Sequence, residues 1–185
     1  MIVKGRQHGF GTANGQIIAV RALSRAASRG MLMIGKSAFP CRLGRAGSSA
    51  RKREGDGTSP VGTFVLRRLF FRADRVPRPV RRPAATVLNR RHGWCDDPSS
   101  PLYNRLIALP SPWRHEKMWR EDGLYDFIIE IGYNDAPVRH GMGSAVFLHL
   151  MAGDGKPTEG CIALKRRDMN RLIARLKPGA RISIG

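Results

Sequence analysis

A histidine and a cysteine twelve positions apart are the residues of this sequence best suited to chemistry. His149 ends one apolar run and Cys161, preceded by Gly160, opens another, within AVFLHLMAGDGKPTEGCIAL (145–164). A cysteine attacks acyl groups as its thiolate, so it needs a nearby base, donors for the oxyanion and exposure on a tight turn. Gly160 allows the backbone to approach a substrate and turn its amides toward that oxyanion. The stretch predicts a nucleophilic thiol beside its base.

Other interpretations of these residues stay open. Side chains alternate along a strand, so His149 and Phe147 are expected on one face of a sheet that would hold the imidazole rigidly. However, unpaired cysteines are usually buried and inert, so Cys161 also fits a small apolar residue at a strand start. His149 would then be an ordinary hydrogen-bonded histidine. His140, in RHGMGS and 21 positions before Cys161, is a rival base.

The remaining thiols do not predict a metal site or a disulfide framework. Three cysteines at positions 41, 95 and 161 are too few and too scattered, and none forms a C-x-x-C pair. His92 and Cys95, in HGWCDD, lack two further ligands at recognisable spacing. We therefore expect Cys95 to be structural, with Trp94 packing over a loop.

Length and charge limit the class of protein. The chain has 185 residues, 42% of them hydrophobic, and we expect a single domain over residues 1–185. Its formal net charge of +19 suggests a polyanionic partner such as nucleic acid, acidic glycan or a membrane surface. The arginine cluster RVPRPVRR (75–82) has no interleaved aromatics that would stack on bases, so it favours general polyanion attraction, and no nucleic-acid partner is expected.

The N-terminal thirty residues show neither an export signal nor a membrane span. Their longest apolar run, IIAV (17–20), is shorter than a signal-peptide core. This expectation leaves a cytoplasmic location, a missing leader or another export route open.

The elements that must position the candidate residues are mostly strands. Period-two or apolar patterns bounded by turn residues predict strands at 17–23, 30–35, 62–71, 125–134 and 144–150. Helical spacing of apolar residues predicts a helix over 166–176, and a last strand follows within 177–185. Residues 72–104 read as a long ordered loop or a set of short elements over the surface. The predicted fold class is mainly β, a β-dominated α+β domain in which small sheets pack together with a C-terminal helix.

Two segments resemble the L,D-transpeptidase catalytic domain family (YkuD-like). That family carries a histidine at a strand end and then a turn of Ser or Thr, His, Gly and Cys, which is matched here by His149 and TEGCIAL (158–164). Its "TPxGxF"-like strand entry is matched by GDGTSPVGTF (55–64). The resemblance covers about residues 30–185, and it favours His149 over His140 because the family histidine directly follows an apolar strand.

The chain departs from the family pattern near the thiol, as a divergent branch would. Glu159 replaces the turn histidine, Ala163 stands where Asn or Arg is frequent, and the interval between histidine and cysteine is short. A carboxylate facing the thiol would raise the thiol pKa unless cations offset it, and Lys156, Lys165 and Arg166 are the candidates. A solvated Glu159 is the favoured interpretation.

The resemblance implies a peptidoglycan L,D-transpeptidase of the periplasm or cell envelope, without a metal or organic cofactor, and a carbapenem target. Cys161 would attack the L,D-amide of a donor stem peptide, His149 would take the thiol proton, and the amides of Gly160 and Cys161 would hold the oxyanion. An amine of a neighbouring stem, the acceptor partner, would complete a cross-link, whereas water would make the site an L,D-carboxypeptidase.

Three further residues are candidates for substrate binding. Arg139, Tyr133 and Glu159 are expected to contact the charged groups of the stem peptide, and Asn134 lies among them. An ordinary hairpin edge explains Arg139 and Tyr133 equally well. The alternative from another class is a non-catalytic basic protein that binds a polyanion, in which Cys161 plays no part.

Overall fold

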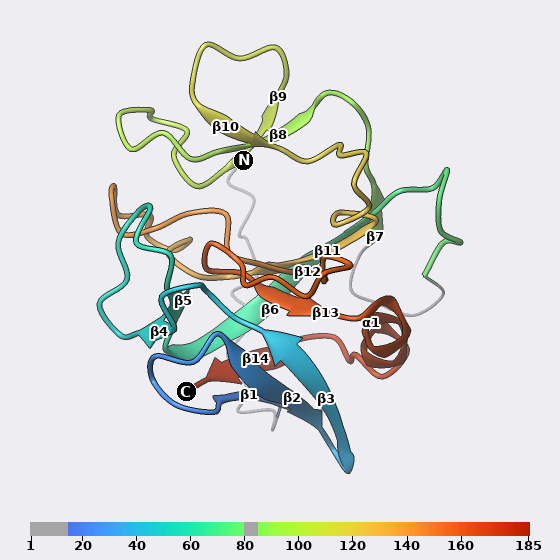
Figure 1. Cartoon of the computed structure of the whole chain (residues 1–185). Helices are drawn as coiled ribbons and strands as arrows, with labels where there is room; N and C mark the ends of the chain where they lie inside the picture. The colour runs from blue at the N-terminus through green and yellow to red at the C-terminus, as the bar shows by residue number, and fades with distance from the viewer. Residues whose placement is uncertain (1–14, 80–84) are drawn as a thin grey trace, which may run out of the picture.

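The structure, a computed structural model, describes residues 15–79 and 85–185. Figure 1 shows a group of strands through the centre and base of the molecule, a smaller group above them and a helix at one side. In chain order the elements are β1 (Ile17–Ala22), β2 (Arg29–Ile34), β3 (Ser37–Arg42), β4 (Ser48–Ser49), β5 (Ser59–Pro60), β6 (Gly62–Phe71), β7 (Ala85–Val87), β8 (His92–Cys95), β9 (Leu106–Ala108), β10 (His115–Lys117), β11 (Phe127–Ile131), β12 (Phe147–Leu150), β13 (Ile162–Leu164), α1 (Arg166–Ile173) and β14 (Arg181–Ile184).

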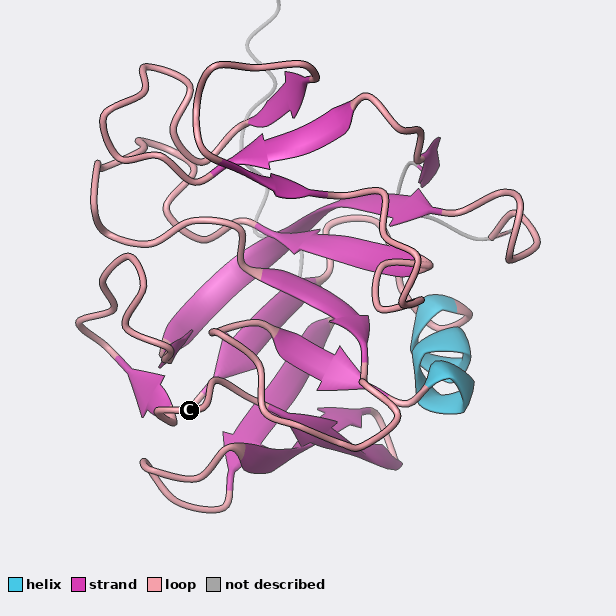
Figure 2. Ribbon diagram, turned by 45° about the horizontal axis from the view of Figure 1, so that its top comes forward, coloured by secondary structure: helices cyan, strands magenta, loops and turns pink. Residues whose placement is uncertain are grey.

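The main sheet closes on itself. Its nine strands run in the order β11-β12-β13-β3-β2-β1-β14-β6-β7, and β11 also pairs with β6. The long strand β6 makes this possible because β14 pairs with residues 62–65 and β11 with residues 66–71. Figure 2 shows the strands curving around a common interior with the helix against one side. Closure removes most exposed strand edges.

Alternate side chains of the central strands enter two different hydrophobic clusters. On β12, Leu148 and Leu150 belong to the main core inside the closed sheet, whereas Phe147 belongs to a second cluster on the outer face. On β11, Ile129 and Ile128 divide in the same way. Strands buried on both faces read as continuous apolar runs, which is why these two segments are conspicuous in the sequence.

A separate three-stranded sheet, with the order β10-β8-β9, covers the second cluster. Trp94 of β8 and Met118, just after β10, belong to this cluster, and Trp94 packs edge-on against Phe147. The segment 72–104, predicted as a long loop or short elements, thus contributes β7 and β8 as short elements. Cys95 is buried in β8, as expected of a structural cysteine.

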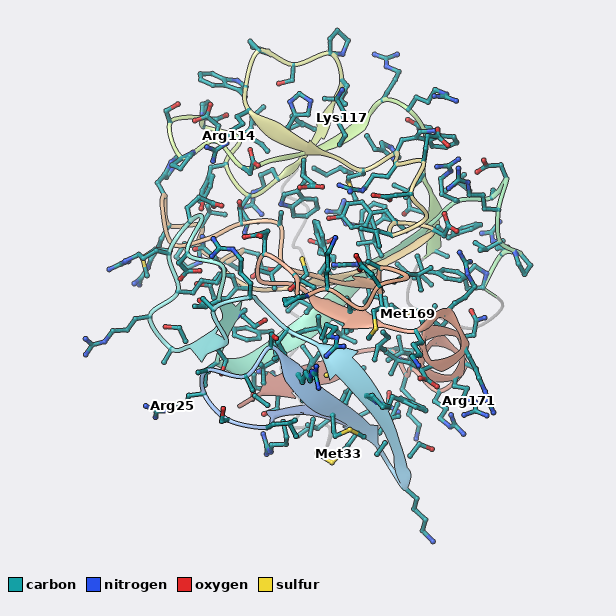
Figure 3. All side chains as sticks on the ribbon, viewed as in Figure 1. Arg25, Met33, Arg114, Lys117, Met169 and Arg171 are labelled. Atoms are coloured by element: carbon teal, nitrogen blue, oxygen red, sulfur yellow. The ribbon has the colours of Figure 1, made fainter. Side chains whose placement is uncertain are left out.

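The helix α1 lies against the main sheet through one apolar face. Met169, Leu172 and Ile173 are its buried residues, and Leu176 is buried just beyond its end. Figure 3 shows Met169 on the side of the helix that faces the sheet and Arg171 on the side turned away. The helix ends earlier than the predicted 166–176, and the apolar residues that recur at helical spacing are the ones that are buried.

The predicted fold class is confirmed: the described residues form a mainly β structure with one C-terminal helix and a last strand. Sequence analysis missed β3, because Pro40 argues against a strand interior. The structure tolerates Pro40 because β13 pairs only with Cys41 and Arg42 of that strand, so the neighbouring edge is free at Pro40. Residues 1–14, which belong to the N-terminal stretch without a visible signal peptide, and residues 80–82 of the arginine cluster lie outside the described residues.

Replacing Leu148 by alanine tests how strongly the main core holds β12. Leu148 is fully buried, so Leu148→Ala should lower the free energy of unfolding by about 3 kcal/mol, the usual cost of such a cavity. Leu23, which is 70% exposed, provides the control, and Leu23→Ala should cost less than about 0.5 kcal/mol. Denaturant unfolding measures both values. Equal losses in the two variants would contradict the placement of Leu148 in the core.

Candidate active site

Cys161 and His149 line the same cavity. It has a volume of about 500 Å³ and opens between the turn before β13, the loop before β6 and the three-stranded sheet. Lys52, Glu116, Arg120 and Tyr125 are among the other residues of its wall. Arg114, labelled in Figure 3 near the upper sheet, also reaches this wall. The cavity therefore combines a thiol, an imidazole and charged groups of both signs.

The parallel pairing of β12 with β13 brings the two residues together. Leu148 lies beside Ile162 and His149 beside Ala163. Extending this register by one residue places Cys161 beside Phe147, so Cys161 and His149 share one face, two positions apart on adjacent strands. The shared face of Phe147 and His149 agrees with the predicted alternation. The small Ala163, where the family often has Asn or Arg, adds no bulk beside the imidazole.

His149 is buried and held in one tautomer. Its Nδ1 lies 2.7 Å from the carbonyl oxygen of Leu150. Because a carbonyl only accepts, Nδ1 carries the hydrogen and Nε2 of the neutral ring is left as a proton acceptor. The ring of Tyr125 packs edge-on against it, with centroids 5.4 Å apart. Burial lowers the pKa of His149 from 6.5 to about 4, so the imidazole is neutral at physiological pH.

The thiol of Cys161 is half-buried and hydrogen-bonded to the backbone before β12. Its Sγ donates to the carbonyl oxygen of Ala145 at 3.2 Å and accepts the amide hydrogen of Phe147 at 3.3 Å. Burial raises the pKa of this thiol to about 12, against the lowering effect of the Phe147 amide. The resting pair is therefore a neutral thiol and a neutral imidazole.

Thr158 fixes the turn that presents Cys161. Its hydroxyl donates to the carbonyl oxygen of Cys161 at 2.6 Å and accepts the amide hydrogen of Gly160 at 3.2 Å. Gly160 has φ +138°, a conformation in which a Cβ would also lie 2.7 Å from the carbonyl oxygen of Thr58. Gly160 is thus required by the turn, and its amide, predicted as an oxyanion donor, is engaged by Thr158.

The two signature segments of the sequence meet in space at this turn. Gly44 forms a bridge with Thr158, and its amide donates to Ser59 Oγ at 2.9 Å. Ser59, in the GDGTSPVGTF segment, donates in turn to the carbonyl oxygen of Cys161 at 3.4 Å. A Cβ at Gly44 would lie 2.3 Å from the backbone of Gly57. The first segment therefore supports the turn carried by the second.

Three residues singled out in the sequence do not line the cavity in the described part of the chain. Arg139 is exposed, and its backbone pairs with the side chain of Asn134. The hydroxyl of Tyr133 donates to the carbonyl oxygen of Met142 at 2.5 Å. His140 stacks on Tyr103 and bonds to the backbone of Pro98. The structure does not bring Arg139, Tyr133 or His140 to Cys161, because the hairpin between β11 and β12 carries them away from β13.

Glu159 lies at the rim of the cavity and points to solvent. Its carboxylate pairs with Arg45 at 2.8 Å and is 76% exposed. Lys156, also in the wall, pairs with Asp154. Arg166, the first residue of α1, was predicted as a cation that could offset Glu159, but it contacts Asp126 instead. Arg45 is thus the direct partner of Glu159.

Lys52 and Asn104 are parts of the site that sequence analysis missed. Asn104 accepts hydrogen bonds from Trp94 Nε1 and from the amide of Ala145, which fixes the carbonyl that Cys161 contacts. Lys52 is buried in the cavity wall and pairs with Asp56. Both lie far from Cys161 in sequence, in segments without recognisable spacing, so no local pattern signals them.

Neither a metal cluster nor a membrane helix occurs in residues 15–79 and 85–185. No group of three or more His, Cys, Asp or Glu side chains in this part of the chain is placed to hold a metal ion. Within the same residues, no helix has the length and apolar character needed to cross a membrane.

Several solved structures resemble this one at low sequence identity. The helical cell shape determining protein Pgp2 from Campylobacter jejuni is 15% identical over 94% of this chain and 48% of its own, with a TM-score of 0.48. L,D-transpeptidase 1 of Mycobacterium tuberculosis is 12% identical over 92% and 62%, with a TM-score of 0.40. An L,D-transpeptidase from Mycobacterium smegmatis is 13% identical over 92% and 59%, with a TM-score of 0.41. The chain thus spans roughly half to three fifths of these proteins.

Comparison with protein families gives a direct match. No curated protein matches the sequence. The profile of the YkuD family, described as the L,D-transpeptidase catalytic domain, matches residues 27–184 and includes both signature segments. Since the match extends over most of the chain, the protein belongs to the YkuD family of L,D-transpeptidase catalytic domains.

Proposed function

We propose that this protein is a peptidoglycan L,D-transpeptidase that works through a cysteine acyl-enzyme, with residues 1–185 as one catalytic domain. The observation that carries the proposal is the placement of the Cys161 thiol and the His149 imidazole in one cavity, with Nδ1 of His149 committed to Leu150. Family membership supports the reaction class. The geometry therefore favours enzymatic acyl transfer over simple polyanion binding.

The reaction starts from a neutral pair. As Cys161 Sγ attacks the carbonyl carbon of the L,D-amide in a donor stem peptide, Nε2 of His149 accepts the thiol proton. Burial disfavours a resting thiolate–imidazolium pair because it penalises both charges. Proton transfer during attack avoids the free thiolate and makes the imidazole a general base.

Collapse of the tetrahedral intermediate completes the first half-reaction. The C–N bond of the amide breaks, His149 returns its proton to the leaving amine, and a thioester on Cys161 remains. In the second half, the amine of an acceptor stem attacks the thioester, gives its proton to His149 and releases Cys161 as thiol. Water in place of the amine yields an L,D-carboxypeptidase at the same site.

The oxyanion needs donors near Cys161. The amide of Cys161 is the proposed donor, because it has no acceptor among the residues that the structure describes. The Gly160 amide donates to Thr158, so its proposed role is to shape the turn. For substrate binding, Glu159 and Arg45 at the rim are the proposed contacts for charged groups of the stem peptide. The periplasm or cell envelope is the proposed location because that substrate lies there.

Replacing each candidate histidine by alanine tests which of them is the general base. His149→Ala should abolish acylation of Cys161 by a carbapenem at neutral pH, because the thiol loses its proton acceptor. His140→Ala is the matched control and should retain most acylation, since His140 lies on Tyr103 and outside the cavity lining. Intact-mass measurement reports the adduct, and Cys161→Ala should show none. The reverse result for the two histidines would overturn the assignment.

The pH dependence of acylation tests the neutral pair. A histidine of pKa about 4 stays neutral as the pH falls below 6.5, so the acylation rate should be lost only as the pH approaches 4. At pH about 5.5 an ordinary imidazole is about nine-tenths protonated and would have lost most of its rate. Stopped-flow or mass-resolved rates measure the profile. A tenfold fall between pH about 7 and 5.5 would contradict a buried neutral base.

Neutralising Glu159 tests whether its carboxylate belongs to the thiol's surroundings. Glu159→Gln should change the rate of Cys161 alkylation by iodoacetamide less than about twofold, because the exposed carboxylate is paired with Arg45 and screened by water and salt. A large increase in the alkylation rate would place the charge of Glu159 beside the thiol and make it part of the nucleophile's environment.

A further inference from the structure

The ammonium group of Lys52 is a buried cation that the proposed reaction does not yet use. The side chain is only 4% exposed, and Nζ donates to Asp56 Oδ1 at 2.9 Å. An ammonium has three donors, and among the described residues Asp56 is the acceptor found for it. Because Lys52 also belongs to the cavity wall, this incompletely paired cation stands where an anion would be stabilised.

Gly143 and Gly160 have no side chains, and this leaves space for the Lys52 side chain to reach the cavity. A Cβ at Gly143 would lie 2.9 Å from Lys52 Cε, and a Cβ at Gly160 would lie 3.0 Å from Lys52 Nζ. The two glycines have φ +97° and +138°, so both the space and the backbone conformation select glycine. The ammonium is therefore fixed against the backbone of the residue that precedes Cys161.

Asp56 holds Lys52 without cancelling it completely. Its carboxylate also accepts hydrogen bonds from the amides of Arg53 and Thr58 and from the hydroxyl of Thr58. Burial opposes the charge of this carboxylate, yet these bonds together hold the pKa of Asp56 below its ordinary value. The negative charge of Asp56 is thus shared among several donors, which leaves positive potential on the cavity side of Lys52.

We propose that Lys52 is a positioning residue that stabilises negative charge on the sulfur of Cys161 as the thiol gives up its proton. The inference rests on the proposed function, in which Cys161 is the nucleophile. A cation fixed before the reaction needs no reorganisation when charge develops, so it stabilises the attacking sulfur more than a mobile surface lysine would. Lys52 acts through Cys161 and contacts no reacting bond.

Charged and titratable groups from several elements share the cavity with Cys161. They are Lys52, Glu54, Asp96, Arg114, Glu116, Arg120, Tyr125, His149, Lys156 and Glu159. Burial is the largest influence on the thiol and raises its pKa; the Phe147 amide lowers it, Glu116 raises it and Lys52 lowers it. Among the cations of this set, Lys52 lies against Gly160 and lowers the pKa of the thiol.

Two substitutions, one that removes a positive charge and one that removes a negative charge, distinguish stabilisation of the sulfur from structural support of the loop. Lys52→Met removes the cation and keeps the length of the side chain, so alkylation of Cys161 by iodoacetamide at a fixed pH should slow by about tenfold, as a one-unit rise in thiol pKa requires. Asp56→Asn removes the counter-charge, so alkylation should become faster. Lys36→Met is the matched control and should change little, because Lys36 is exposed in the turn between β2 and β3 and lies outside the cavity lining.

Rates are measured over a series of pH values by site-resolved mass spectrometry, and thermal unfolding is recorded for each variant. Opposite displacements of the log rate against pH for Lys52→Met and Asp56→Asn support the proposal. Displacements in the same direction, or none, overturn it, because a purely structural role loosens the loop in both variants. If Lys52→Met does not fold, the sign for Asp56→Asn decides. If the unsubstituted protein is not acylated by a carbapenem but the two variants show these opposite shifts, the proposed function is wrong and the role of Lys52 stands.

Discussion

The site depends on one pairing, the parallel alignment of β12 with β13. This register places Cys161 two positions from His149 on the same face, although the segment 151–161 separates the end of β12 from the start of β13. Backbone hydrogen bonds fix the register, and the core side chains Leu148 and Leu150 fix which face is inside. A slip by one residue would turn the imidazole and the thiol to opposite faces, so the proposed chemistry requires this register.

The environment created by that sheet determines how the pair can react. The three-stranded sheet covers the outer face of β12, so His149 is buried and Cys161 is half-buried. Burial keeps His149 unprotonated, which suits a base, but it also makes the Cys161 thiolate costly. The proposed nucleophile, Cys161, needs fixed donors and fixed charge to offset that cost. The Phe147 amide donates to its sulfur, and the Lys52 ammonium is the proposed charge.

The segment that runs from the β4–β5 loop into β5 both supports the turn at Cys161 and positions a charge. Ser59 donates to the carbonyl oxygen of Cys161, and Asp56 holds Lys52 in the cavity wall. Gly160 serves both functions, because its missing side chain admits the Thr58 carbonyl and the Lys52 ammonium. The two segments that resemble the family in sequence are therefore one structural unit in space, which gives a physical reason for finding them in the same chain.

The sequence by itself determined the local features: the mainly β class, the helix face of Met169 and Leu172, and the face shared by His149 and Phe147. These follow from side-chain periodicity, which acts over a few residues. It did not separate His149 from His140 by spacing, and it suggested Arg139 and Tyr133 as substrate contacts. Only the tertiary structure shows which of these residues lie near Cys161, because strand pairing brings β13 beside β12 and carries the hairpin away. Lys52 could not be predicted for the same reason. It comes near Cys161 only because the loop that carries it packs against the turn at Gly160, and periodicity within a short segment does not predict such a long-range contact.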